Sequence, residues 1–224
     1  IKQECVAKSA FWVTKKRYGQ WIINDGGVVC DKLDVKGLDI VRSNFPVAMR
    51  KLMTTVLKDI LSNEDKELID DKIIEFKNSM KNLPLEDIAL PTGVKNLGKF
   101  ADKRKVGKIY GKGSILTPMH KGTPVHVKSA WVYNDLLKHF GLENVEKIKN
   151  SEKIKWVYLK QNPLSISQIA FKGYDDPKEI MDYINQYVDH SKLFEKALKK
   201  KIDMFYDSMD WTLVDKKNTL ERFF

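Results

Sequence analysis

The feature that most constrains the fold is a turn signal near the N-terminus. Asn24-Asp25-Gly26-Gly27 consists of residue types that tolerate positive φ. It separates two runs, 18–23 and 28–35, that are rich in β-branched and aromatic residues. This arrangement predicts a β-hairpin.

A cluster of cations stands directly before the first predicted strand. Lys15, Lys16 and Arg17 precede Tyr18, so three positive charges lie beside an aromatic ring where the strand begins. A rigid hairpin holds such side chains in place, which suits the recognition of a fixed polyanionic surface. The alternative is a solvated basic corner, because charged side chains usually face water.

The overall charge favours an anionic partner. The 224 residues include 40 Lys and Arg against 30 Asp and Glu, a formal charge of +10, which favours nucleic acid or an anionic membrane surface. No apolar run approaches the roughly 18 residues of a membrane span, and the N-terminus lacks the layout of a signal peptide. Cys5 and Cys30 are too few for a disulfide scaffold or a zinc site. The expectation is a soluble intracellular protein with reduced thiols, and the initial Ile1 indicates a fragment of something longer or a trimmed chain.

The middle and end of the chain predict an α+β protein. A helix start at Ser43-Asn44-Phe45-Pro46 precedes an apolar stripe from Met49 to Leu61, and Leu68, Ile69, Ile73, Phe76 and Met80 define the buried face of a second, antiparallel helix. An extended segment at 124–130 leads into a helix at about 130–140. Strands at 154–160 and 167–171 follow, and helices begin at Pro177 and at about Ser191.

A basic segment interrupted by glycines lies between these parts. From Lys95 to Lys128 there is one acidic residue, Asp102, and the basic residues are Lys95, Lys99, Lys103, Arg104, Lys105, Lys108, Lys112, Lys121 and Lys128. We interpret the segment as a loop-rich binding surface, since Ile109-Tyr110 and Ile115-Leu116 provide apolar anchors. The alternative is a disordered loop.

No catalytic constellation is evident in the sequence. His120 and His126 lack a third ligand at metal-binding spacing, and neither a Walker loop nor a Gly-x-Ser-x-Gly motif occurs. In an extended segment His126 would lie on the opposite face from Val125 and Val127, beside Lys128, where it could neighbour a phosphate. We therefore predict no catalytic residue and no metal site in this chain.

The last residues predict a peptide that binds a partner. Leu220, Phe223 and Phe224 are spaced to meet on one side of a helical turn. Chain termini are poor places to bury large apolar groups, whereas a partner's groove can accept them. The alternative is that the two phenylalanines fold back on their own domain.

Several segments, in this order, resemble the C-terminal part of family B replicative DNA polymerases, most closely those of T-even-like phages. Lys15-Lys16-Arg17-Tyr18 is similar to the family's basic palm motif, and residues 36–42 are similar to the strand that leaves the palm for the thumb. Thumb-like segments are Gly122 to Lys128 with Tyr133-Asn134, residues 155–160 with Asn162-Pro163, and residues 187–194. Leu220, Phe223 and Phe224 resemble a sliding-clamp-binding peptide, with Lys217 where many such peptides carry Gln.

The resemblance implies three parts. Residues 1–40 would be the end of the palm, a β-hairpin with its basic motif; residues 41–214 a mostly helical thumb with a small β-sheet; and residues 215–224 a clamp-binding tail. Expected partners are primer-template double-stranded DNA, a sliding clamp and the remaining polymerase domains, in the cytoplasm of a phage-infected bacterial cell, with no membrane. The implied DNA-binding residues are Lys15, Lys16, Arg17, Tyr18, Arg42, Lys105, Lys108, Lys112, Lys121, His126 and Lys128.

The family's metal-binding, nucleotide-selecting and proofreading motifs do not occur in this sequence. Two Mg²⁺ ions are expected in the missing palm, because phosphoryl transfer needs them to stabilise charge on the reacting oxygens. The chain is therefore expected to be part of a DNA-directed DNA polymerase and to lack catalytic activity by itself. Two alternatives stay open: a freestanding nucleic-acid-binding module, and the C-terminal half of a split polymerase.

Overall fold

A computed structural model describes residues 4–101 and 116–215. The chain divides into two compact units, one built from residues 1–83 and 194–224 and the other from residues 84–193. Each unit contains one antiparallel three-stranded sheet together with helices, so the protein is α+β. None of the helices in the described ranges is long and apolar enough to cross a membrane.

The sheet of the first unit contains the predicted hairpin and one further strand. Strands β1 (Cys5–Thr14), β2 (Arg17–Asp25) and β3 (Val28–Lys36) pair in that order. The turn at 24–27 is confirmed, with Gly26 and Gly27 at positive φ. Strand β1 is an addition to the prediction, because its sequence mixes small and polar residues without a clear alternation.

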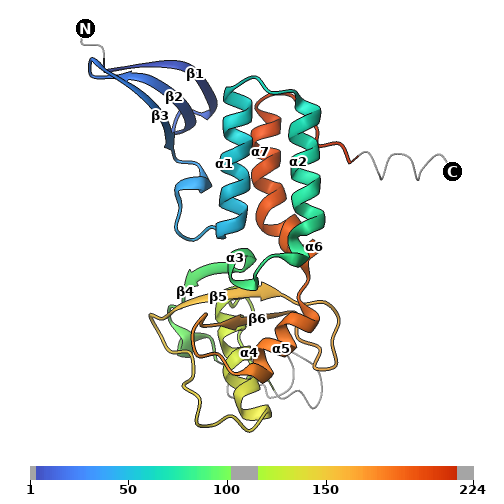
Figure 1. The fold of residues 1–224 in the computed structure, drawn as a ribbon. Coiled ribbons are helices and arrows are strands. Elements are labelled where there is room, and N and C mark those ends of the chain that lie inside the picture. The colour runs from blue at the N-terminus through green and yellow to red at the C-terminus, as the bar shows by residue number, and fades with distance from the viewer. Residues whose placement is uncertain (1–3, 102–115, 216–224) are drawn as a thin grey trace, which may run out of the picture. The chain divides into compact units, whose positions relative to one another are not determined.

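Helices of the first unit lie side by side next to the sheet (Figure 1). They are α1 (Val47–Leu61), α2 (Lys66–Ser79) and α7 (Lys200–Asp207), with short helices η1 (Asp39–Val41) and η2 (Met80–Asn82) and a π-helical segment, η4 (Phe194–Lys199), that leads into α7. The predicted antiparallel pair is α1 and α2. The placement of Leu68 on the buried face is wrong: it is 51% exposed, and the buried positions of α2 are Ile69, Asp70 and Ile73.

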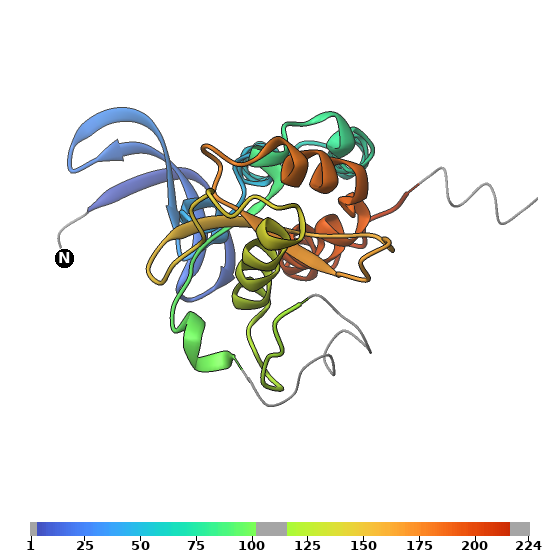
Figure 2. The ribbon, with the colours of Figure 1, turned by 90° about the horizontal axis from the view of Figure 1, so that it is seen from below.

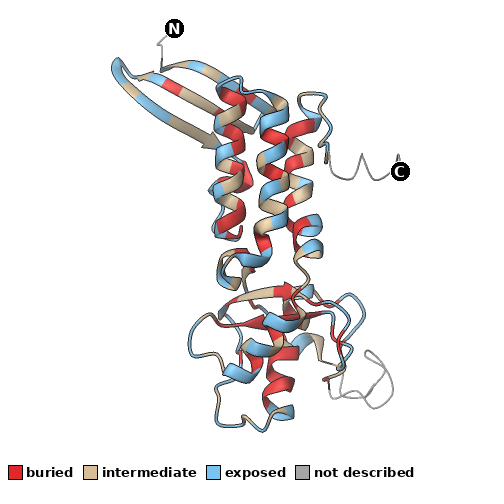
Figure 3. Ribbon diagram, turned by 45° about the vertical axis from the view of Figure 1, so that its right-hand side comes forward, coloured by how far each residue is buried: buried red, intermediate tan, exposed pale blue. Residues whose placement is uncertain are grey.

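The sheet packs on the helices through one of its two faces. Gly19 in β2 lies against α1 so closely that a Cβ atom there would be 2.8 Å from Leu57 Cδ2. Opposite Gly19 in the register is Phe11, whose ring meets Phe205 of α7 edge-on at 5.2 Å. Since successive strand residues point to opposite faces, these contacts define an inner face of the sheet. Figure 3 shows that the strands of this sheet contain fewer buried residues than α1, α2 and α7 do.

A buried carboxylate ties α2 to α7 and to the chain that follows. Asp70, 3% exposed, pairs with Lys66 Nζ at 2.5 Å and accepts hydrogen bonds from Tyr206 Oη at 2.7 Å and Val214 N at 3.3 Å. Burial and the Asp70 carboxylate both raise the pKa of Tyr206, so its hydroxyl stays protonated as a donor. The segment after α7 is thereby held along α2.

The second unit places a helix across its sheet. Strands β4 (Leu90–Gly93), β5 (Lys153–Tyr158) and β6 (Gln168–Phe171) pair in that order, and α4 (Val125–His139) packs on β6 (Figure 2). All four residues of β6 are buried. The remaining helices are α3 (Leu85–Ile88), η3 (Leu97–Phe100), α5 (Lys178–Tyr187) and α6 (His190–Leu193). The buried Asn134 side chain of α4 exchanges two hydrogen bonds with the backbone of Ile148, of 2.9 and 2.7 Å.

The predicted extended segment at 124–130 is wrong. Helix α4 begins at Val125 directly after Pro124, whose fixed φ suits a helix start. Two β-branched valines suggested a strand, but the pattern Val127, Ala130, Tyr133 and Asn134 is helical and buries that side of α4. The separate strand β4 was not predicted, because four residues are too few to show a period.

We expect Asp70→Ala to destabilise the first unit by about 2–4 kcal/mol, because Lys66 loses its partner and the Tyr206 hydroxyl is left buried without an acceptor. Urea denaturation followed by circular dichroism measures this. Tyr206→Phe is the matched control, with a cost of about 1 kcal/mol, since it removes only the hydroxyl. Equal stabilities of Asp70→Ala and wild type would contradict the anchoring role of Asp70.

Candidate nucleic-acid interface

The cationic residues Lys15 and Lys16 form the two-residue turn between β1 and β2. Thr14 and Arg17 are paired across this turn, and both lysine side chains are exposed. The backbone of the turn lies against Gly37, which has φ +67°; a Cβ there would be only 2.0 Å from the Lys16 carbonyl oxygen. A glycine at position 37 therefore lets the chain leaving β3 pass directly beneath the turn.

Arg17 contacts a helix of the first unit. It shares the inner face with Gly19, two residues further along β2, and its Nη1 donates to Met204 Sδ of α7 at 3.2 Å. Arg17 is partly buried as a residue, and this contact joins it to α7 of the same unit. Arg17 thus helps to fix the start of β2 on the helices.

The outer face of the sheet carries an aromatic and cationic row beside the turn. Trp12, Tyr18 and Lys36 are paired across the three strands. The rings of Trp12 and Tyr18 are 4.4 Å apart and inclined by 38°. Trp12 is 52% exposed, and the Lys36 side chain is 59% exposed with Asp34 at 3.3 Å. We call Trp12, Tyr18, Lys36 and the turn lysines the outer-face cluster.

Sequence reasoning missed Trp12 and Lys36 as members of this cluster. Trp12 lies on β1 and Lys36 on β3, whereas Tyr18 lies on β2. Only the strand register brings the three residues next to one another. A predicted β1 would not have been enough, because a regular two-residue turn at 15–16 places Val13 opposite Tyr18. The register shift between Trp12 and Thr14 brings Trp12 opposite Tyr18 instead.

Arg42 is held at the end of η1 by a buried acid. Asp39, 9% exposed, contacts Arg42 Nη1 at 3.2 Å and Lys201 Nζ of α7 at 2.9 Å. The Arg42 side chain remains 47% exposed. It therefore keeps an accessible surface while its position is fixed.

In the second unit, the predicted phosphate neighbours lie at the start of α4. Lys121 is exposed in the turn before the helix, where Thr123 Oγ1 donates to the His120 carbonyl at 2.5 Å. His126 and Lys128 are half-exposed on the first turns. Because α4 is helical there, the expectation that they lie side by side is wrong: residues two apart on a helix point about 200° apart. Partial burial lowers the pKa of His126, so it is neutral at pH 7.

Two parts of the basic segment, residues 100–101 and residues 117–120, are joined to each other, and Thr117 is joined to α4. Ala101 and Met119 form an antiparallel bridge, and His120 N donates to the Phe100 carbonyl at 2.9 Å. The buried Asp135 accepts hydrogen bonds from Thr117 N and, at 2.7 Å, from Thr117 Oγ1. Burial raises the pKa of Asp135, and the bonds from Thr117 oppose that rise. These contacts bring residues 101 and 119 together on one side of α4.

Several predicted site residues fall outside the described ranges. Lys105, Lys108 and Lys112 of the basic segment do so, as do Leu220, Phe223 and Phe224 of the tail.

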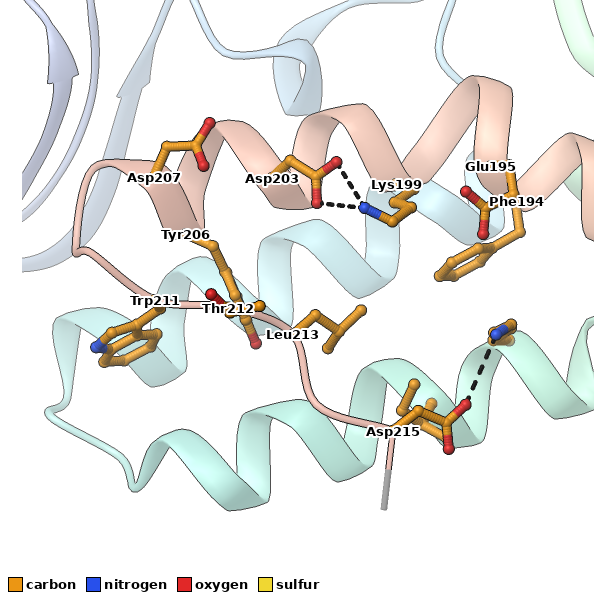
Figure 4. A pocket seen from close by; sticks show the side chains of 12 residues that line it. Phe194, Glu195, Lys199, Asp203, Tyr206, Asp207, Trp211, Thr212, Leu213 and Asp215 are labelled. Atoms are coloured by element: carbon orange, nitrogen blue, oxygen red, sulfur yellow. Dashed lines mark hydrogen bonds and ion pairs between the residues drawn. The ribbon is translucent and has the colours of Figure 1, made fainter. Parts of the chain in front are cut away.

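A pocket of about 250 Å³ lies between α2, α7 and the segment after α7 (Figure 4). Its lining includes the carboxylates of Glu195, Asp203, Asp207 and Asp215. Its two lysines are paired with acids, Lys199 with Asp203 at 2.9 Å and Lys77 with Asp215 at 3.7 Å. Such a lining repels phosphate, so we do not assign this pocket to the nucleic-acid interface.

No group of three or more His, Cys, Asp or Glu side chains in residues 4–101 and 116–215 is arranged to hold a metal ion.

The exposed lysine turn lies beside aromatic rings, on the sheet face turned away from the helices. Such an arrangement is typical of proteins that bind the sugar-phosphate backbone of a nucleic acid. The sequence profile of DNA polymerase family B matches residues 1–208, and the chain belongs to this family. It is also 24% identical over 196 residues to a DNA-directed DNA polymerase of Enterobacteria phage T4. That alignment covers 86% of this chain and 20% of the relative, so the chain spans about one fifth of the relative's length.

We expect Gly37→Ala to destabilise the first unit by about 3 kcal/mol, because the new Cβ would collide with the Lys16 carbonyl at a left-handed φ. The matched control is Gly27→Ala, which also has positive φ but no atom within 4 Å of the added Cβ. It should cost only about 1–2 kcal/mol. Urea unfolding compares the two, and equal losses would show that the contact beneath the turn does not matter.

Proposed function

We propose that this chain is the C-terminal part of a DNA-directed DNA polymerase, comprising the end of the palm and the thumb, and that it grips primer-template duplex DNA during replication. The observation that carries the proposal is the exposed Lys15-Lys16 turn, fixed by Gly37 and flanked by Tyr18, in a chain that belongs to DNA polymerase family B. Lys16 and Tyr18 would lie near the primer 3′ end. Lys15 would contact the backbone, and Arg17 would support the turn from the inner face.

Contacts of this kind suit an enzyme that copies any sequence. Lysine side chains bind phosphate oxygens that are the same at every base pair, so they position the duplex without reading it. Each neutralised phosphate releases condensed counterions, which makes the affinity fall steeply with salt. The rigid turn places these charges without a large ordering cost.

The second unit would supply phosphate contacts further back along the duplex. Lys121 and Lys128 carry positive charge at the start of α4, Arg42 contributes from the first unit, and His126 could donate from its neutral imidazole. Lys105, Lys108 and Lys112 of the basic segment would add further phosphate contacts. The described residues on either side of them include Ala101 and Met119, which pair with each other.

In this proposal residues 1–40 belong to the palm, residues 41–214 to the thumb and residues 215–224 to a clamp-binding tail. The remaining polymerase domains, on the same chain or on a partner polypeptide, would carry the two Mg²⁺ ions and the chemistry in the cytoplasm of a phage-infected bacterium. A freestanding DNA-binding module is the alternative. Co-purification with a polypeptide that carries the catalytic aspartates distinguishes a split polymerase from such a module.

The first test is fluorescence-anisotropy binding of a primer-template, a blunt duplex and a single strand across a salt series. We expect the two duplex-containing DNAs to bind more tightly than the single strand. Lys16→Ala should weaken duplex binding about fivefold and reduce the salt slope by about one unit, because one phosphate contact is lost. Lys32→Ala is the matched control: it removes the same charge from the same sheet, but Lys32 already pairs with Asp25 at 3.3 Å.

Weak binding to all three DNAs that Lys16→Ala leaves unchanged would mean that the turn is a solvated basic corner, and the proposed grip would be abandoned.

The tail is tested separately. Removal of residues 217–224 should abolish binding to the purified sliding clamp of the replication system in which the polymerase works, measured by surface plasmon resonance, because Leu220, Phe223 and Phe224 are the proposed apolar plug. DNA binding should stay the same. Clamp binding that survives the truncation would refute the assignment of the tail.

A further inference from the structure

One large aromatic side chain of the outer-face cluster has no role in the grip described above. Trp12 is 52% exposed although it lies in a paired strand, and its neighbours in the sheet are Tyr18 and then Lys36. A tryptophan with this much exposed surface is uncommon outside binding sites, because burying its rings is strongly favourable. Its location beside two exposed lysines indicates that the ligand is anionic.

The geometry of the ring pair leaves one side of Trp12 open. Tyr18 lies against it at 4.4 Å with the rings inclined by 38°, and the inner face of the sheet is occupied by the helix contacts of Phe11 and Gly19. The exposed part of Trp12 therefore belongs to the outer face, next to the lysines. A flat apolar surface beside cations can hold a base by stacking while the cations hold its phosphates.

Continuous duplex offers little for such a ring to stack on. Inside a duplex each base is covered by its neighbours on both sides, whereas the last base of a strand has a free face and unstacks at low cost. A ring that stacks on a base thus discriminates in favour of a strand end, while lysine contacts to phosphates do not.

We propose that Trp12 stacks on the terminal nucleotide of the bound DNA, so that the outer-face cluster binds a strand end more tightly than continuous duplex. This inference rests on the proposed function and names a feature of the DNA that the lysine turn alone cannot select. Tyr18 would hold the Trp12 ring in place from the side opposite to the base.

The test compares two DNAs of equal duplex length with the full chain: a primer-template and a dumbbell whose strands have no ends. The wild-type protein should bind the primer-template at least about fivefold more tightly, in line with the stacking of one base on an aromatic side chain. Trp12→Ala and Trp12→Leu should reduce this ratio to about one while leaving dumbbell binding unchanged. Trp12→Phe, which keeps a ring, should retain part of the preference.

A second readout does not depend on affinity. A primer with 2-aminopurine at its 3′ terminus should show different fluorescence in complexes with wild type and with Trp12→Leu, because only the wild type covers the base. Val29→Ala is the control variant for an exposed apolar residue elsewhere in the sheet, 84% exposed at the far end of the hairpin. It should behave as wild type in both measurements.

Failure of this inference is distinguishable from failure of the proposed function. If Lys16→Ala weakens both DNAs and the Trp12 variants keep the wild-type ratio, the grip stands and the stacking role is overturned. A wild-type ratio of one also overturns it. If Lys16→Ala changes neither DNA, the proposed function itself fails.

Discussion

The close packing of β2 on α1 at Gly19 determines which surface of the first sheet faces outward. Only a residue without a Cβ lets Leu57 approach the strand this closely, and Phe11 and Arg17 extend the same contact to α7. Because side chains alternate across a strand, this contact on one face leaves Trp12, Tyr18 and Lys36 on the other. The arrangement of the candidate interface is thus a consequence of a packing contact that lies behind it.

Buried acids have a structural role that leaves the basic residues free to face outward. Asp39 holds Arg42 and Lys201, Asp70 holds Lys66, Tyr206 and the chain after α7, and Asp135 holds the chain at Thr117. Each acid is nearly inaccessible to solvent, where an unpaired carboxylate would be costly. The acids thus contribute to the anchoring of segments, and the lysines of the turn and of α4 dominate the charge near the candidate contacts.

Much of the fold could be predicted from the sequence because its signals are local. The turn at 24–27, the helices on either side of residues 62–65, and the strands that became β5 and β6 depend on residues a few positions apart. The errors fall where local patterns are ambiguous. Val125 and Val127 indicated a strand, yet Pro124 starts a helix there, and Leu68 was assigned to a buried face that Asp70 occupies instead. Strands β1 and β4 lacked a readable period, so only their pairing partners define them.

By itself the sequence determined the charge, the position of Lys15, Lys16, Arg17 and Tyr18 at the start of a strand, and the resemblance that the match to DNA polymerase family B bears out at the level of the family. These follow from residue types and their order. Only the tertiary structure decided that Arg17 points inward to Met204, and that Trp12 and Lys36 join Tyr18 in one row. The physical reason is that strand register and the choice of inner face are set by contacts between residues far apart in the chain, such as Gly19 with Leu57 and Phe11 with Phe205, which no local pattern specifies.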